Sequence, residues 1–528
     1  MKPRHYLALF IVGLIVPFAI SRFQQLPGYM DADYYFAGGV ELAKGNGFTE
    51  PYLWNYLDDP QGLPHPSHTY WMPLASIVSA LGMWSMGQTT YAAGRLPFIL
   101  LSACVPLLTA TLAFDISRRT RLAMVSGLLS IFSLYYAPFM PVPDNYAIYM
   151  LLGAAFLLLA PRSQKWIPLA LGALAGAMTL ARSDGLLWLG LAGLTVMWKS
   201  AQSPLSLWER VRLALSKVEV VRVIPAGLFI LLGYLLVMGW WHYRNYSLFG
   251  SFMTPGGGRL LWLESYNQTF SYPAESITRE RFLQAGWSAA LEDRLRALNA
   301  NAGNAFAAQG GIFLFPFILI GLWELRKEFR TRLAATGWLI LLVVMTVVFP
   351  FAGARGSFFH GGAALQPYWW VAAPIGLDRV IAAARRRGMF ADNAYVVFQG
   401  MLVVLAASMT LYLVNLRVLG EWATEDGVYA SVEEKFIENG ISPEVGVIVR
   451  NPPGYYISSG RPAIALPYGD ESVILEVAER YGAGLLVLEG SGTFDWIQEL
   501  YDNPQGNGAF IYLGEVDEAK LYIIAPER

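Results

Sequence analysis

The first 39 residues, MKPRHYLALFIVGLIVPFAISRFQQLPGYMDADYYFAGG (residues 1–39), decide how the rest of the chain is interpreted. A basic flank precedes the apolar run 6–20, which is typical of a signal peptide or of a first membrane helix. No small-residue cleavage motif follows, so we expect an uncleaved helix with a cytoplasmic N-terminus. Asp31 and Asp33 would then emerge on the outer face of the membrane.

The composition agrees with a membrane location. Of the 528 residues, 55% are hydrophobic and 15% are charged, and the mean hydropathy is +0.40. The apolar share is well above that of a soluble domain and the charged share well below it, which indicates an integral membrane protein. The net charge of -1 gives no reason to expect a nucleic-acid partner. The single Cys104 excludes an intrachain disulfide framework.

Ten further apolar segments follow the N-terminal one, and together they predict about eleven membrane-spanning helices. Several are short for a hydrocarbon core of about 30 Å, so their boundaries carry an error of a few residues. The segments are 96–114, 122–141, 146–160, 166–180, 186–198, 223–241, 312–323, 333–351, 368–384 and 395–416.

One more segment, WMPLASIVSALGMWSM (71–86), is apolar enough to span but contains Pro73 and has aromatic ends. The positive-inside rule decides between the two threadings. If this segment lies in the interface, all the basic loops are cytoplasmic, whereas they all face outward if it spans. These loops are 118–121, 162–165, 199–222, 326–332 and 385–387. We therefore expect residues 63–95 to form juxtamembrane helices and loop.

This threading predicts a first outer loop at 21–95, a second at 242–311 and an outer tail from about residue 417. In the tail, short β-branched runs alternate with the helix-like stretch SVILEVAERYG. That pattern indicates a small soluble α/β domain. The predicted fold is a mainly α polytopic membrane domain over 1–416, followed by an extracytoplasmic α/β domain over 417–528.

The acidic pair behind the first helix allows two interpretations. Asp31 could cap a helix over 32–44 that Gly45 closes, with Asp33 as a first-turn acid that complements the helix dipole. Alternatively, the pair belongs to a catalytic site.

Two further acids favour the catalytic alternative. Asp144 in PVPDNY and Asp184 in ARSDG also lie at predicted outer turns, so the acids could converge. Such acids can act as a general base or hold a divalent cation, and their spacing does not decide between the two.

Basic groups also lie at predicted outer positions: Arg244 in WWHYRNY, and Arg355 with His360 in GARGSFFHGG. A guanidinium suits a phosphate because it can donate two parallel hydrogen bonds. The structural alternative is headgroup anchoring or a local ion pair. His65 and His68 match the spacing of metal ligands only loosely.

The stretch DADYYFAGG, followed by the turn KGNGF, resembles the first outer loop of the GT-C glycosyltransferases. This superfamily includes protein O-mannosyltransferases, aminoarabinose transferases and oligosaccharyltransferase catalytic subunits, which use polyprenyl-linked sugar donors. Further similar stretches follow in the same order: HPSHTYWMPL, GRLPFILLSA, PDNYAIYMLLGAAF, LARSDGLLW and WHYRNYSLFG. The resemblance covers residues 1–416 and implies a membrane enzyme that transfers a sugar from a polyprenyl phosphate to an acceptor outside the cytoplasm.

The resemblance also implies residue roles. Asp31 matches the catalytic acid, which deprotonates or orients the acceptor, and Asp144 matches a second outer-loop acid. The chain departs from the pattern at Ala32, because many relatives carry an acid directly after the first Asp and here the second acid is Asp33. It stays open which of the two is the base, and whether Mg²⁺ or Mn²⁺ is held by Asp31, Asp33 and Asp144.

The expected partners are a polyprenyl-phosphate sugar donor, the lipid bilayer and a protein, lipid or glycan acceptor. The candidates for binding the substrate and its lipid phosphate are Arg244, Arg355, His360, His68, Arg182 and Tyr34. The tail sequence YYISSGRPAIALP is similar to the tails of some bacterial members, and we expect a bacterial plasma-membrane protein.

The main alternative is a transporter of a lipid or polar solute. A transporter would carry ionisable residues near the middle of the bilayer. Here Asp31, Asp144, Asp184, Arg244 and Arg355 lie at predicted outer ends, so the transferase is the favoured hypothesis.

Overall fold

The computed structural model describes residues 1–200, 217–391, 393–420, 422, 426–490, 497–504 and 508–525, apart from the side chains of residues 200, 217–223 and 426. It consists of two compact units. The helical unit comprises Met1–Ser21, Phe98–Phe252 and Arg294–Val418, and the sheet unit comprises Arg22–Pro97, Met253–Asp293 and Leu419–Arg528. The predicted first outer loop and the C-terminal tail therefore belong to the same unit.

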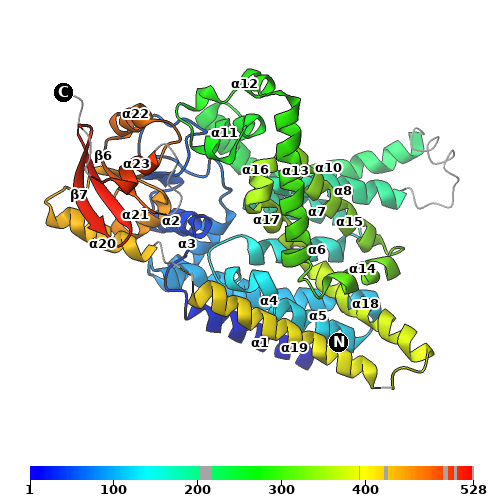
Figure 1. Ribbon diagram of the computed structural model, residues 1–528. Helices are drawn as coiled ribbons and strands as arrows, with labels where there is room; N and C mark the ends of the chain where they lie inside the picture. The colour runs from blue at the N-terminus through cyan, green and yellow to red at the C-terminus, as the bar shows by residue number, and fades with distance from the viewer. Residues whose placement is uncertain are drawn as a thin grey trace. The chain divides into compact units, whose positions relative to one another are not determined.

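Each of the eleven predicted apolar segments contains a helix. These helices are α1 (Pro3–Ser21), α4 (Tyr91–Ser117), α5 (Thr120–Ile131), α6 (Tyr146–Leu159), α7 (Ile167–Ala181), α8 (Leu186–Ser200), α10 (Lys217–Phe249), α14 (Phe315–Glu324), α15 (Phe329–Val343), α18 (Gln366–Arg386) and α19 (Ala394–Val414) (Figure 1). The connections contain α13 (Gly286–Asn304), α16 (Pro350–Ala352) and α17 (Phe358–Gly362).

Five helices in the described part of the chain are long and apolar enough to cross a membrane. They are Pro3–Ser21, Tyr91–Ser117, Ile224–Phe249, Phe329–Val348 and Ala394–Leu419. The count of about eleven spans stays a prediction, because several of the other apolar helices have only 10 to 17 residues. Segment 71–86, for which the sequence allowed two threadings, forms α3 (Leu74–Met86). Its 13 residues fall short of the roughly 20 that a span needs.

Helix α10 shows how the helical unit packs. A Cβ atom at Gly172 of α7 would lie 1.9 Å from the Ile230 carbonyl oxygen, and one at Gly233 would lie 2.0 Å from the Leu169 carbonyl oxygen. Only glycine allows the two backbones to approach this closely, as in other membrane helix pairs. Leu228 and Leu236 of α10 are exposed, as expected for a surface that faces lipid.

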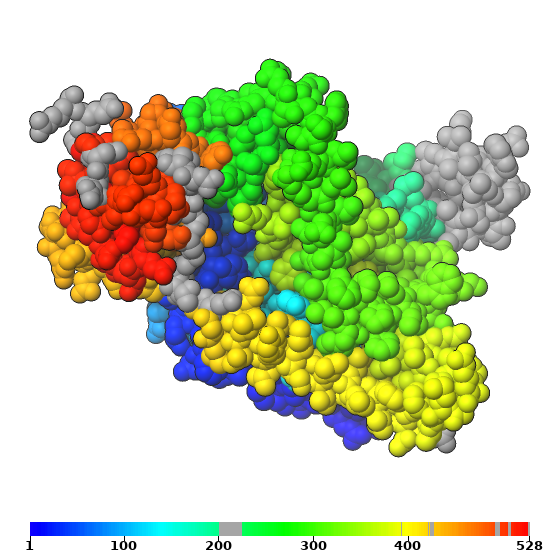
Figure 2. All heavy atoms as spheres, in the orientation of Figure 1, coloured from blue at the N-terminus to red at the C-terminus, as the bar shows by residue number. Residues whose placement is uncertain are grey.

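Helix α19 is a second surface element of the helical unit, and Figure 2 shows it in yellow on the visible face. Val396, Val404 and Leu411 are each at least 65% exposed. Exposed large apolar side chains on a helix of this length fit a lipid-facing position.

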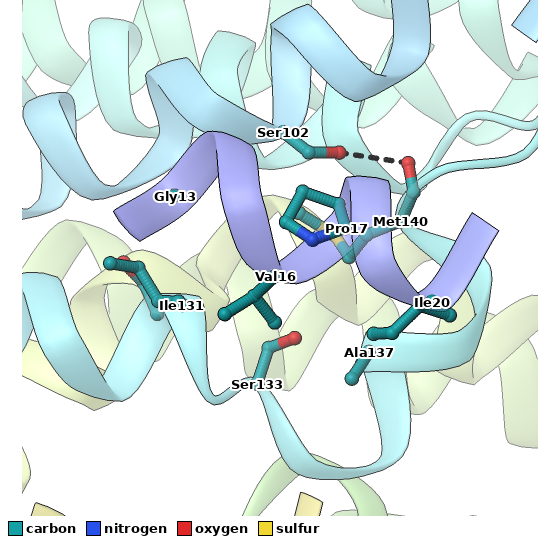
Figure 3. Close-up of a pocket in the computed structure, with 10 residues that line it drawn as sticks. Gly13, Val16, Pro17, Ile20, Ser102, Ile131, Ser133, Ala137 and Met140 are labelled. Carbon is teal, nitrogen blue, oxygen red and sulfur yellow. Dashed lines mark hydrogen bonds between the residues drawn. The ribbon is translucent and has the colours of Figure 1, made fainter. Parts of the chain in front are cut away.

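A small cavity lies beside α1 in the helical unit (Figure 3). Its volume is about 10 Å³, and Pro17, Ser102 and Ser133 are among the residues that line it. The Ser102 hydroxyl donates to the Met140 carbonyl at 2.8 Å. This volume holds about one water molecule, so the cavity is too small for a sugar or a prenyl chain.

At one end of the helical unit, three predicted cytoplasmic loops meet around Asp115 of α4. Its carboxylate pairs with Arg118 at 3.2 Å, with Arg162 at 3.0 Å and with Arg330. These arginines come from three separate loops, so the loops lie at the same end of the unit, as the threading requires.

Asp378 of α18 joins a further loop to this end. It pairs with Arg121 at 2.5 Å and with Arg119 at 3.4 Å. Arg121 and Arg385 both lie over the Tyr395 ring. The basic loop predicted at 199–222 lies largely outside the described residues, and the side of the membrane on which this end lies stays a prediction.

The sheet unit contains a six-stranded sheet of order β2-β5-β4-β6-β8-β7. The parallel strands are β2 (Tyr52–Leu53), β5 (Ala463–Ala465), β4 (Gly446–Val449) and β6 (Ala483–Leu488), and the antiparallel ones are β8 (Ala519–Ile524) and β7 (Phe510–Val516). The tail thus forms the predicted α/β arrangement. Strand β2 comes from the predicted first outer loop, which joins the sheet through only two residues.

Helices cover this sheet. Helix α22 (Glu471–Tyr481) packs on it through Ile474 and Val477, and Figure 1 shows α20 (Asp426–Glu438) on the opposite side. The remaining elements of the unit are α2 (Met30–Lys44), α3, α11 (Pro255–Arg259), α12 (Arg279–Gln284), α21 (Pro452–Ser459), α23 (Gln498–Asp502) and the strand pair β1 (Thr49–Glu50) and β3 (His65–Pro66).

Candidate active site

Asp144 in the helical unit lies just before α6 and is almost fully buried, with 1% of its surface exposed. One carboxylate oxygen accepts from the Asn145 N–H, and the other lies 3.5 Å from Nε2 of His360 on α17. The segments that carry Asp144 and His360 are in close backbone contact. A Cβ at Gly153 of α6 would lie 1.9 Å from the carbonyl oxygen of Ala364, which follows α17.

The hydrogen bond of His360 shows which of its ring nitrogens carries a hydrogen. Nδ1 of His360 lies 3.0 Å from the Gly356 carbonyl oxygen, which can only accept, so Nδ1 carries a hydrogen. Nε2 is then the ring nitrogen that faces the Asp144 carboxylate. Asp144 and His360 are therefore close enough to share or exchange a proton.

Aromatic rings fix the position of His360. The Tyr146 ring stacks on the imidazole at 4.4 Å between centroids. The neighbouring Phe359 stacks on Tyr136 at 4.3 Å, and the Tyr136 hydroxyl donates to the Phe359 carbonyl at 3.1 Å. These contacts restrain both the ring and the backbone that carries it.

Asp184 lies in the short helical turn η2 (Ser183–Gly185). It accepts from the Tyr149 hydroxyl at 2.6 Å, and from Nε and Nη2 of Arg182 at 3.2 Å each. A Cβ at Gly361 would lie 2.9 Å from its Oδ2 atom. Asp184 therefore lies directly beside the residue that follows His360.

The structure thus brings together residues from three separate segments of the helical unit. We call this group the α6–α17 cluster; its members are Asp144, Tyr146, Tyr149, Arg182, Asp184 and His360. Asp144 and His360 offer one carboxylate and one imidazole nitrogen, a pair that can share a proton or contribute two ligands to a divalent cation such as Mn²⁺.

The other two predicted phosphate ligands of this unit lie on different elements. Arg244 is near the end of α10, where it donates to the Asn245 side chain at 3.2 Å and lies 4.4 Å over the Trp241 ring. Arg355 is exposed on the turn η8 (Gly353–Ser357), which precedes α17. Arg244 thus contacts two residues of its own helix, and its role in phosphate binding stays a prediction.

In the sheet unit, α2 begins at Met30, and the N-cap position belongs to Tyr29. Asp31 and Asp33 both lie in the first turn. The alternative in which Asp31 caps this helix is therefore wrong, because the helix starts earlier than the polar pattern indicated. The predicted end of the helix at Gly45 is confirmed, with the φ of 87° that favours glycine.

The two acids in the first turn of α2 differ in their surroundings. Asp33 is 1% exposed, and its Oδ2 atom accepts from the Asn451 amide at 2.8 Å. Asp31 is only partly buried. Asp31 and Asp144 belong to different units, so the predicted convergence of these two acids stays a prediction.

Tyr34 and His68 are buried in the sheet unit and contact each other. The His68 N–H donates to the Tyr34 hydroxyl at 2.7 Å. The His68 ring bonds Ser67 at 2.8 Å and Ser76 at 2.9 Å through its two nitrogens. Both ring nitrogens are thus engaged within the unit, and a role of His68 or Tyr34 in phosphate binding stays a prediction.

His65 has different partners. Its Nε2 atom lies 3.1 Å from Glu50, and Nδ1 lies 3.9 Å from Asp58. Burial alone would lower the pKa of His65, but the neighbouring Glu50 and Asp58 carboxylates raise it above its ordinary value. Burial also raises the pKa of Glu50. The two histidines of the loose metal-ligand pattern thus contact separate groups.

Several residues of these sites were not singled out in the sequence. Tyr146 and Tyr149 follow Asp144 within the first two turns of α6, and this spacing could have indicated them. Asn451, which precedes two prolines in NPPGYY, shows an N-cap pattern. No local pattern connects Asn451 with α2.

No protein-family profile and no curated protein sequence matches the chain. Among solved structures, the chain is similar to ArnT from Cupriavidus metallidurans bound to undecaprenyl phosphate, with a TM-score of 0.60 and 13% identity over 99% of this chain and 98% of that one. The apo form of ArnT gives a TM-score of 0.58 and 13% identity over 98% and 97%.

A second neighbour is the archaeal oligosaccharyltransferase AglB from Archaeoglobus fulgidus, in complex with an inhibitory peptide and a dolichol-phosphate. Its TM-score is 0.52 and its identity 13%, over 91% of this chain and 69% of that one. The predicted resemblance to GT-C glycosyltransferases is thus confirmed at the level of the fold. With its apolar helices, the chain is a multi-pass membrane protein.

Proposed function

We propose that the protein transfers a sugar from a polyprenyl-phosphate donor to an acceptor on the outer side of the membrane. The observation that carries the proposal is the α6–α17 cluster, where the buried Asp144 faces an imidazole beside the Arg182–Asp184 pair. The shared fold supports it, because the ArnT structure holds undecaprenyl phosphate and the AglB structure holds dolichol-phosphate.

In the proposed reaction, an acceptor oxygen or nitrogen forms a bond to the anomeric carbon of the sugar. The bond from that carbon to the phosphate oxygen breaks, and its electron pair leaves with the polyprenyl phosphate. The acceptor proton passes to a carboxylate, for which Asp31 is the first candidate and Asp144 the second. Arg182, Arg244, Arg355 and His360 are the cationic candidates for stabilising the leaving phosphate.

The first test is donor turnover in proteoliposomes that are supplied with labelled polyprenyl-phosphate sugars and an acceptor extract. We expect turnover by the wild type and a loss of about 100-fold or more in Asp31→Asn and in Asp144→Asn. The matched control is Glu479→Gln, which neutralises an exposed acid on α22. A wild type that turns over no donor overturns the proposal in favour of a transporter, and full activity in Asp31→Asn removes Asp31 from the mechanism.

A divalent cation, Mg²⁺ or Mn²⁺, is the cofactor that the proposed acids could hold through oxygen ligands. It would neutralise charge on the leaving phosphate. The measurement is turnover after chelation and after the addition of each metal. Loss on chelation with recovery in Mn²⁺ or Mg²⁺ supports a resident metal, whereas unchanged turnover leaves the carboxylates to act as bases alone.

The proposed location is a bacterial plasma membrane with the basic loops in the cytoplasm. A reporter fused after Arg119 should then be cytoplasmic. An external reporter at that position overturns the threading, and with it the outer location of Asp31 and Asp144.

A further inference from the structure

The C-terminal segment contacts α2 within the sheet unit. Asn451 caps α21: its side-chain oxygen accepts from the Gly454 N–H at 3.2 Å. The amide nitrogen of the same side chain donates to Asp33 at 2.8 Å. Asn451 is 3% exposed and Asp33 1%. One buried side chain thus fixes the start of α21 and the first turn of α2 at once.

A second contact joins the same two helices two turns further along α2. The Tyr456 hydroxyl donates to Glu41 at 2.7 Å. The other oxygen of Glu41 accepts from the Asn46 amide at 2.7 Å. Both buried carboxylates of α2 therefore accept a hydrogen bond from a neutral side chain of α21 or of its N-cap residue.

Helix α21 is itself fixed to the rest of the unit. The Tyr455 hydroxyl donates to Glu433 of α20 at 2.9 Å. The fully buried Arg461 binds the same carboxylate with two hydrogen bonds, of 2.8 and 2.7 Å. A bidentate buried pair of this kind holds its elements in a single geometry, so α21 offers α2 a rigid support.

Asp31 and Asp33 cannot face the same partner. Residues two apart on a helix project about 200° from each other, given 3.6 residues per turn. Because Asp33 is directed at Asn451, the side chain of Asp31 leaves α2 on roughly the opposite side of the helix from that of Asp33. The orientation of the first turn, and with it the direction of Asp31, depends on what holds Asp33.

We propose that Asp33 and Asn451 are positioning residues, through which the C-terminal segment sets the orientation of Asp31. This inference rests on the proposed function, in which Asp31 is the base. It assigns Asp33 a role through Asp31, and it makes the C-terminal segment a required part of the catalytic protein.

The most specific test exchanges the side chains of Asp33 and Asn451. The double variant Asp33→Asn with Asn451→Asp keeps one amide, one carboxylate and the hydrogen bond between them. Asp caps a helix as well as Asn does, so α21 keeps its cap. Each single variant instead opposes two amides or two carboxylates. We expect each single change to lower kcat about 10- to 100-fold with KM unchanged, and the double variant to return within about threefold of the wild type.

A second readout does not depend on turnover. Hydrogen exchange of the amides of residues 30–44 should be faster in both single variants and restored in the double variant. The matched control is Asn439→Asp, the same chemical change at an exposed position at the end of α20. It should leave both the exchange and the turnover unchanged.

The outcomes separate the two proposals. If exchange recovers in the double variant and turnover does not, the Asp33 carboxylate takes part in the chemistry and the positioning role is overturned. Single variants with unchanged exchange in α2 overturn it as well. A wild type that is inactive on every donor, combined with the expected exchange pattern, removes the proposed function and leaves the connection between α2 and the C-terminal segment in place.

Discussion

Three acids of the helical unit, Asp115, Asp144 and Asp378, have two kinds of partner. Asp115 and Asp378, at the end with the basic loops, pair with three and two arginines respectively. Asp144 is more deeply buried than either, and it faces the imidazole of His360. A guanidinium keeps its proton, so the ion pairs of Asp115 and Asp378 connect loops and do not transfer protons. An imidazole can both donate and accept a proton, so Asp144 beside His360 can take part in proton transfer.

The largest expected effect is on activity, and it should distinguish the acid that faces histidine from an acid that pairs with arginines. Asp144→Asn should lower kcat by about 100- to 1,000-fold because it removes a group that holds or accepts a proton. Asp378→Asn should keep turnover per folded molecule within about threefold. Both are measured as donor turnover in proteoliposomes at saturating donor. Equal losses in the two variants would show that burial, and not the partner, decides the role of these acids.

The second expected effect is on stability, for which Asp378→Asn is the variant with the expected loss. Asp378→Asn leaves Arg121 and Arg119 without their shared carboxylate, which should cost about 1–3 kcal/mol once solvent screening of the partly exposed arginines is allowed for. Thermal unfolding midpoints in detergent measure it. Glu479→Gln serves as the exposed control, and a midpoint for Asp378→Asn equal to that control would contradict the structural role.

The third prediction uses the sheet unit, where His65 pairs with Glu50. The pKa of His65 is raised in the folded protein, so its contribution to stability is fully present below the ordinary pKa of about 6.5. That contribution is lost as the pH rises through the raised value, and the raised pKa of Glu50 acts in the same direction. We expect the thermal unfolding midpoint of the full chain to decrease as the pH rises from about 6.5 through the raised pKa of His65, and His65→Asn to flatten this decrease. A midpoint that rises with pH over this range would contradict the assignment.

The smallest effect tests the two arginines of Asp378 against each other. Arg119 is 65% exposed and Arg121 is 30% exposed. Arg119→Ala should therefore cost less than about 1 kcal/mol, and Arg121→Ala should cost more. The same detergent unfolding measurement distinguishes them. A larger cost for Arg119→Ala would mean that the exposed arginine carries the loop contact.

Much of the fold could be predicted from the sequence. Long apolar runs place helices because a backbone in hydrocarbon must satisfy its own hydrogen bonds, so all eleven segments contain helices. The lengths of the helices were predicted less well. Segment 122–141 contains α5 and the separate turn η1 (Leu134–Phe139), where Leu134 has a φ of 57°. Hydropathy does not register a break of this kind inside an apolar run.

The candidate site could also be predicted only in part. Asp144, Asp184, Arg182 and His360 could be selected as polar residues at the ends of apolar segments, and the structure brings them together. The role of Asp33 could not be selected in this way. Its partner Asn451 lies 418 positions away, and a carboxylate at the start of a helix looks the same whether it faces solvent or a buried amide.

The sequence by itself determined the membrane class, the helical segments, the α/β tail and the positions of the acids, because these depend on local composition and periodicity. Only the tertiary structure decided which acids pair with arginine and which with histidine, that β2 joins the sheet of the tail, and that Asn451 holds Asp33. Such pairings depend on the packing of segments that are far apart in the chain, and hydrophobic periodicity carries no record of which surfaces will meet.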